Sequence, residues 1–214
     1  MLTRPTDWDK IEGIEYGEYE NLELGGHEVI IKKAYVYTNQ KNGNESLKIE
    51  VDIAGNDKQK GYFQRQFDSN PNADKSWPNG ACRYISLREE ENCLRMFKGF
   101  TTCVEKSNPG YVWNFDETTL VGKKLCGVFG LEQYEKQDGS TGFSTRLMQF
   151  RSLDKLSEVK IPKVRFLDGS QLDYEEYKEV QKMQKSHLNN HSNDKKSDAK
   201  VNANHQVIED NILD

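Results

Sequence analysis

The stretch EVIIKKAYVYTNQKNGNESLKIEVDI, residues 28–53, predicts two β-strands joined by a loop rich in Asn, Gln and Gly. In the second strand the apolar side chains alternate with polar ones and share one face: Leu47, Ile49, Val51 and Ile53. The opposite face carries Ser46, Lys48, Glu50 and Asp52. This alternation is typical of a strand whose sheet has one face in the core and one in solvent.

The first strand of this pair has apolar residues on both faces. Simple alternation puts one set together: Val29, Ile31, Lys33, Tyr35 and Tyr37. The opposite set is Ile30, Lys32, Ala34 and Val36. Two apolar faces favour a strand that is central in its sheet or sharply curved.

The remaining elements of the body follow from periodicity and turn signals. The sequence predicts a third strand at 61–67 (GYFQRQF), an irregular segment at 68–88 and a helix near 89–106. Two more strands are predicted at 123–135 (KKLCGVFGLEQYE) and 143–152 (FSTRLMQFRS). This order predicts a mainly β chain built on an OB-fold-type five-stranded barrel, with one helix between strands three and four. A five-stranded meander capped by a helix would give the same order.

Composition divides the chain into segments of different character. Hydrophobic residues make up 35% and the mean hydropathy is -0.90, so part of the chain is expected to stay outside any core. We expect an acidic lead-in at 1–24, a barrel domain at 25–166 and a segment at 167–185 that can form a short helix. Residues 186–214 are predicted to be a disordered linker and acidic tail. Within the overall net charge of -5, residues 123–165 carry nine bases against five acids.

The cysteines give no sign of a disulfide framework or of a zinc site. None of the four forms a CxxC pair: Cys82, Cys93, Cys103 and Cys126. The sequence shows no signal peptide and no run of about 18 apolar residues. We therefore expect a cytosolic protein with reduced thiols, no bound metal and no membrane contact.

No catalytic motif is recognisable. The sequence lacks GxSxG, HExxH and P-loop patterns, and it has no Cys–His pair at a known local spacing. His27 follows the Gly-Gly turn and is expected at the surface. Glu50 and Asp52 are expected on a solvated strand face. We expect a protein that is not an enzyme and needs no cofactor.

Aromatic and basic residues recur in the body and favour binding of a single nucleic-acid strand, which requires platforms for bases and cations for phosphates. The candidate contacts are Lys33, Tyr35, Tyr37, Lys48, Tyr62, Arg65, Trp77, Arg83, Tyr84 and Arg146. Aromatic residues on strands are core residues more often than platforms. Trp77 stands out because it is expected in a loop with low packing demands, and Lys48 because its strand has a clear polar face.

The last residues combine apolar and acidic side chains after a low-complexity polar segment. Such a sequence suits a short linear motif that binds a hydrophobic pocket rimmed by Lys or Arg. The motif residues would be Ile208, Glu209, Asp210, Ile212, Leu213 and Asp214. An ordinary chain end is the alternative interpretation.

Two segments of the body resemble the phage-encoded single-stranded DNA-binding proteins: 22–63, with its Gly-Gly turn, DIA and GYF, and 123–156. The resemblance covers roughly 22–165. It implies an OB-fold that coats single-stranded DNA in replication and recombination, with an acidic tail that recruits partner proteins. The chain departs from the bacterial relatives, whose tails end in an aromatic residue after a proline, because it ends in Asn-Ile-Leu-Asp.

A different class of function is also compatible with the sequence. A small β-barrel that binds protein rather than DNA, such as a phage anti-host or regulatory factor, would fit the acidic pI of about 5.5. Retention on single-stranded DNA resin would distinguish the two classes. The sequence leaves open whether the protein is a homo-oligomer.

Overall fold

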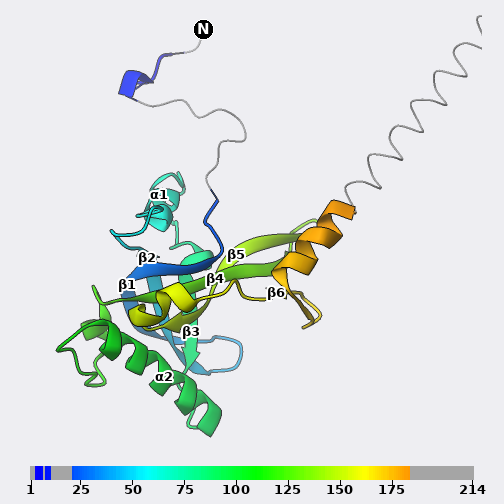
Figure 1. Cartoon of the computed structure of the whole chain (residues 1–214). Helices are drawn as coiled ribbons and strands as arrows, with labels where there is room; N and C mark the ends of the chain where they lie inside the picture. The colour runs from blue at the N-terminus through cyan, green and yellow to red at the C-terminus, as the bar shows by residue number, and fades with distance from the viewer. Residues whose placement is uncertain (1–2, 7, 11–20, 184–214) are drawn as a thin grey trace, which may run out of the picture.

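A computed structural model describes residues 3–6, 8–10 and 21–183, and the expected disordered linker and acidic tail fall outside these residues. Figure 1 shows a sheet with a helix at either end and a long hairpin that projects to one side. The strands are β1 (Gly25–Thr38), β2 (Glu45–Ile53), β3 (Cys82–Ser86), β4 (Lys124–Glu135), β5 (Thr141–Arg151), β6 (Val164–Arg165) and β7 (Gln171–Leu172). The helices are α1 (Tyr62–Asp68), α2 (Glu91–Ser107) and a further helix over 174–183. Short 3-10 turns are η1 (Trp8–Lys10), η2 (Asn79–Ala81), η3 (Glu117–Leu120) and η4 (Leu153–Glu158).

The strands form one open, seven-stranded sheet in the order β3-β2-β1-β4-β6-β7, with β5 paired to β4. The central position predicted for the first strand is confirmed, because β1 pairs antiparallel with both β2 and β4. The helix predicted near 89–106 is also confirmed, as α2. No ladder joins β3 to β5 among the described strands, so the hydrogen-bonded strands form an open sheet.

A β-bulge in β1 explains why this strand has two apolar faces. Ile31 pairs with Val51, but the next pair is Lys33 with Glu50, so the register shifts between them. A bulge adds one unpaired residue and therefore moves the following side chains to the opposite face. The face assignment by simple alternation was wrong beyond this point: Ile31 and Ala34 are both buried, while Lys33 is exposed on the other side.

The segment GYFQRQF, predicted as the third strand, forms helix α1. Gly61 turns the chain with φ 71, and Asp52 on β2 then accepts the backbone N–H groups of Phe63 (3.0 Å) and Gln64 (3.4 Å). A carboxylate on the first N–H groups of a helix stabilises it. The third strand is instead β3, within the segment predicted to be irregular.

The core lies between the inner face of the sheet and the two helices. The sheet supplies the largest fully buried side chains: Val29, Ile31, Ile49, Val51, Leu125 and Phe129. Helix α2 adds Phe100 and Val104, and α1 adds Phe63, whose ring stacks on Phe129 at 5.7 Å. Each such side chain contributes about 1.5–3 kcal/mol on burial. Because this packing holds the strands in place, the side chains on the outer face of the sheet have fixed positions.

His27 is buried, in contrast to its expected place at the surface. It is 4% exposed, with Nδ1 2.9 Å from an Asp57 carboxylate oxygen and Nε2 2.9 Å from the backbone carbonyl of Glu23. Both neighbours are acceptors, so whichever ring nitrogen carries a proton has a partner to donate to. His27 therefore ties the chain entering β1 to the turn after β2.

The outer part of the β4–β5 hairpin carries a second group of packed residues. β6 runs parallel to β4, with Arg165 opposite Glu132, and β7 completes a small hairpin with β6. The ring of Phe143 lies 5.7 Å from that of Phe166 and 5.0 Å from that of Tyr177. The helix over 174–183 therefore packs on the projecting hairpin (Figure 1).

Candidate nucleic-acid interface

Five of the predicted contact residues come together on the outer face of β1, β2 and β3. We call this group the tyrosine–lysine ladder, and it consists of Lys33, Tyr35, Tyr37, Lys48 and Tyr84. Tyr35 pairs with Lys48 across β1 and β2, and Lys48 pairs with Tyr84 across β2 and β3. The bulge in β1 places Tyr35 and Tyr37 on this face, because without it they would point into the core.

Lys48 lies at the centre of the ladder between two rings. Its Nζ is 5.5 Å from the ring centroid of Tyr35 and 5.7 Å from that of Tyr84, and it lies 2.9 Å from the carboxylate of Glu50. Burial alone lowers the pKa of Lys48, but its hydrogen bonds to Tyr35 and Glu50 outweigh burial and raise the pKa. Lys48 therefore stays charged and holds both rings in place.

The polar face of β2 is less solvated than its alternation predicted. Glu50 is 8% and Asp52 5% exposed, because Glu50 pairs with Lys48 and Asp52 binds the start of α1. Cys82, opposite Glu50 on β3, is also buried, and burial raises the pKa of its thiol to about 11. This part of the face is built from paired, enclosed polar groups rather than from free ones.

The end of the ladder nearest the β1–β2 loop is open to solvent. Tyr37 is 38% and Tyr84 45% exposed, and their rings meet edge to face at 5.3 Å. The two rings border a hollow of about 450 Å³ that is otherwise lined by polar side chains: Asn39, Asn42, Asn44, Ser46, Ser86 and Arg88. Exposed rings beside polar groups are suited to stack on bases.

Arg83 and Arg146 meet in a smaller hollow of about 230 Å³ between β3 and the β4–β5 hairpin. Arg146 Nε lies 3.9 Å from the carboxylate of Glu132, and Arg165 pairs with Glu132 across β6 and β4. Burial and, after it, the positive charge of Arg165 lower the pKa of Arg83. Three arginines around one carboxylate leave excess positive charge here, and we call Arg83, Arg146 and Arg165 the arginine cluster.

The other three predicted contacts lie away from the ladder. Tyr62 and Arg65 are on α1, where Tyr62 borders a cavity shared with Arg146 and Arg65 donates to the backbone carbonyl of Lys60. Trp77 does not lie in a loop of low packing demand. It packs against the core, and its indole N–H donates to the Val51 carbonyl at 3.0 Å.

The hollows form a continuous series across the sheet. Tyr84 borders both the hollow beside Tyr37 and the one at the arginine cluster. Asn79 and Arg146 border the latter and also the cavity beside Tyr62. An extended nucleic-acid strand therefore has a continuous path from the β1–β2 loop, over Tyr84, to Arg146.

Sequence reasoning missed several residues of this surface. Asn79, Arg88, Glu132 and Arg165 belong to it, but they come from four separate segments of the chain. Only the pairing of β4 with β6 brings Arg165 to Glu132, and no local pattern encodes a single parallel pair. The excess of bases in 123–165 was the one available signal.

Comparisons with protein-family models and with curated proteins found no match to this chain. Across 3–6, 8–10 and 21–183, no helix has the length and apolar character needed to cross a lipid bilayer. In the same residues no three His, Cys, Asp or Glu side chains are grouped so that they could hold a metal ion.

Proposed function

We propose that the protein binds single-stranded DNA without catalysis, along the tyrosine–lysine ladder and the arginine cluster. The observation that carries the proposal is the continuity of the hollows that they border, with exposed rings at one end and excess positive charge at the other. Stacking on a ring contributes about 1–3 kcal/mol per base and tolerates any sequence. Arginines bind phosphates and release condensed counterions.

An OB-type barrel is the fold that we propose for this function. Two features support it: β1 pairs with both β2 and β4, and β3 and β5 face the same hollow under α2. That hollow is lined by Arg83 and Ile85 from β3, Met96 and Phe100 from α2, and Phe150 from β5. Helix α2 would thus close the gap that the strand ladders leave. Oligonucleotides bind the outer face of strands two and three in OB-folds, where the ladder lies here.

The experiment is a titration of a fluorescent oligothymidine with the full chain at two salt concentrations, with a duplex of equal length as the competitor. Binding should favour the single strand and weaken as salt rises. Equal affinity for duplex and single strand, or no response to salt, would overturn the proposal. Phe115→Ala is the matched control, since it removes an exposed aromatic ring outside the proposed surface.

The acidic tail would recruit replication or recombination proteins of a phage, and in the free protein it would compete weakly with DNA for the arginine cluster. Glu209, Asp210 and Asp214 carry the charge that opposes phosphate. Truncation after residue 200 should raise affinity for DNA modestly at low salt and abolish partner binding in a pull-down. Unchanged affinity would refute the competition, and surviving partner binding would refute the recruitment.

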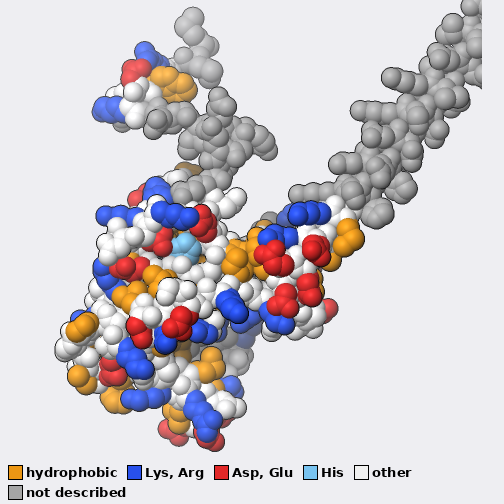
Figure 2. Space-filling model, in the orientation of Figure 1, with side chains coloured by type: hydrophobic (Ala, Val, Ile, Leu, Met, Phe, Trp, Pro, Cys, Tyr) orange, Lys and Arg blue, Asp and Glu red, His pale blue; other side chains and the backbone are white. Residues whose placement is uncertain are grey.

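A second candidate function, protein binding, is favoured by the loop that follows α2. There Val112 is 76% and Phe115 80% exposed, and Phe115 has the only positive φ, 64°, among the described residues other than glycine. Hydrophobic side chains also gather at this end of the molecule in Figure 2. If Phe115→Ala abolished capture of a partner and the single strand did not bind, protein binding would be the better account.

A further inference from the structure

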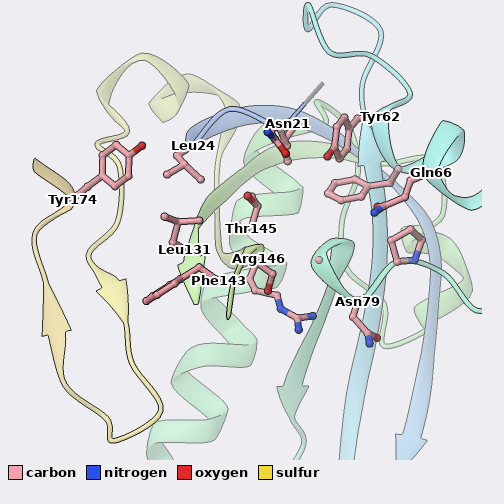
Figure 3. Close-up of a pocket in the computed structure, with 15 residues that line it drawn as sticks. Asn21, Leu24, Tyr62, Gln66, Asn79, Leu131, Phe143, Thr145, Arg146 and Tyr174 are labelled. Carbon is pink, nitrogen blue, oxygen red and sulfur yellow. The ribbon is translucent and has the colours of Figure 1, made fainter. Parts of the chain in front are cut away.

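A cavity of about 550 Å³ lies beside the arginine cluster, between α1, η2 and the β4–β5 hairpin. Figure 3 shows Tyr62 and Gln66 on one side of it, and Leu131, Phe143 and Tyr174 on the other, with Arg146 extending toward Asn79. The volume is within the range of about 300–1,000 Å³ that is typical of small-ligand sites. Nothing in the proposed stacking on the ladder uses this cavity.

Two buried polar atoms belong to residues that line the cavity and lack a hydrogen-bond partner within the described part of the chain. They are Ser144 Oγ and Arg146 Nε. The Glu132 carboxylate lies 3.9 Å from Arg146 Nε, which is too far for a hydrogen bond. An unsatisfied buried donor costs about 1–3 kcal/mol, so such groups call for an explanation. Both atoms have almost no exposed surface, but the Arg146 side chain as a whole is 30% exposed, so a ligand with polar edges would bind its guanidinium group.

The walls are aromatic and the polar groups are few, which suits a planar ligand. Phe143 is held by Phe166 at 5.7 Å and Tyr177 at 5.0 Å, so that wall is supported by packing. Tyr62 packs edge to face on Phe63 at 5.1 Å on the opposite side. The amides of Gln66 and Asn79 each offer a donor and an acceptor. Sequence-specific binding of single strands uses splayed bases stacked on rings and read at their edges.

We propose that this cavity takes one nucleobase splayed out of the bound strand, and that guanine is the preferred base. The inference rests on the proposed function, because the strand reaches the cavity past Asn79 and Arg146, which border both hollows. Guanine presents two adjacent acceptors, O6 and N7, and arginine is their commonest partner. Its amino and imino N–H groups can donate to the amide oxygen of Gln66 or Asn79.

An apolar side chain of a protein partner is a poorer fit to the same cavity. It would fill the space between Tyr62 and Phe143 but would offer no acceptor to the exposed part of the Arg146 guanidinium group. The desolvation cost of that group would then remain in the complex. The guanidinium group and the position next to the arginine cluster also favour a ligand that accompanies phosphates.

The test compares an oligothymidine with the same oligomer carrying one central guanine, by anisotropy titration of the full chain. The guanine-containing oligomer should bind at least about fivefold more tightly, and central adenine or cytosine should give a smaller gain. Arg146→Lys keeps the positive charge for phosphate but loses the planar fork. It should abolish the guanine preference, measured as the ratio of the variant's affinities for the guanine-containing oligomer and for oligothymidine.

A second variant shows whether the result for Arg146→Lys could come from misfolding. A control makes the same Arg-to-Lys substitution outside the cavity. Gln66→Ala removes an exposed amide that lines the cavity without changing charge, and it should reduce the guanine preference. Arg95→Lys, on the exposed side of α2, should leave the preference intact. Thermal unfolding of each variant shows whether it is folded.

The outcomes separate this inference from the proposed function. Binding of oligothymidine with no gain from guanine would overturn the base-binding cavity and leave the function standing. A guanine preference that survives in Arg146→Lys would likewise overturn the assignment to this cavity. No binding of either oligomer would overturn the proposed function itself.

Discussion

The two halves of the tyrosine–lysine ladder lie on the same face but differ in what surrounds them. In the inner half, Lys48 and Glu50 form an enclosed ion pair, with side chains 12% and 10% exposed. In the outer half, Tyr37 and Tyr84 are 38% and 45% exposed and contact mainly each other. One strand face is therefore structural at one end and available to a ligand at the other.

The largest effect should come from breaking the inner half. Lys48→Met leaves the Glu50 carboxylate buried without its partner, and loss of one member of a buried pair costs about 3–5 kcal/mol. The free energy of unfolding, measured in urea, should fall by this amount. Lys33→Met, an exposed lysine on the same face, is the matched control and should change it by less than about 0.5 kcal/mol.

The double variant Lys48→Met/Glu50→Leu sharpens this prediction. Replacing both members by apolar groups removes the unpaired charge, so much of the lost stability should return. If the single variant were as stable as the wild type, the inner half would not be structural and the distinction between the halves would fail.

Breaking the outer half should affect binding and spare stability. Tyr37→Ala combined with Tyr84→Ala removes the exposed rings, and each stacked base is worth about 1–3 kcal/mol. Affinity for oligothymidine should fall about tenfold or more in an anisotropy titration, with the melting temperature nearly unchanged. If the double variant lost much stability but its folded fraction still bound the oligomer, the outer half would be structural and would not bind DNA.

The arginine cluster should respond mainly through salt dependence. Arg83→Gln and Arg165→Gln each remove one charge near Glu132, and each lost phosphate contact lowers the slope of log K against log salt by about 0.7 for a single strand. Arg95→Gln, on α2, is the control with no expected change in slope. An unaltered slope in both cluster variants would place the phosphate contacts elsewhere.

A pH-dependent effect concerns Cys82, which pairs with Glu50 across β3 and β2 in the inner half. Because burial raises its pKa from 9.0 to about 11, the folded state favours the neutral thiol. The stabilisation is therefore present below pH 9 and is lost as the pH rises through 11. Unfolding measured across this window should show a smaller pH-dependent loss in Cys82→Ala than in the wild type. Equal losses would mean that the thiol is not enclosed.

The strand pattern of the sequence predicted β1, β2, β4 and β5, and helical spacing predicted α2. The strand prediction failed at 61–67, because the pattern of Tyr, Phe and Gln there also fits a short helix. The group that stabilises the helix start, the Asp52 carboxylate, lies on β2. The bulge between Ile31 and Lys33 was not predicted either. Both failures come from contacts between separate elements, which no local pattern records.

The candidate site could be predicted only in part, because it too depends on contacts between separate elements. The residue types and the outward position of Lys48 followed from the sequence, but alternation placed Tyr35 and Tyr37 on the wrong face of β1, and the exposure of each ring was not predicted. Trp77 was expected to be free and is packed, whereas Tyr84 was one candidate among many and is the ring that joins two hollows. Exposure depends on the neighbouring segments, here η2 and the β4–β5 hairpin.

Stacking of bases on the outer half of the ladder is tested most directly by photo-crosslinking. The full chain is crosslinked to an oligomer that contains iododeoxyuridine, and the peptides are identified by mass spectrometry. A stacked base crosslinks to the ring beneath it, so we expect adducts on Tyr37 or Tyr84 and their loss in the double alanine variant. Adducts confined to the loop that carries Val112 and Phe115 would contradict this expectation.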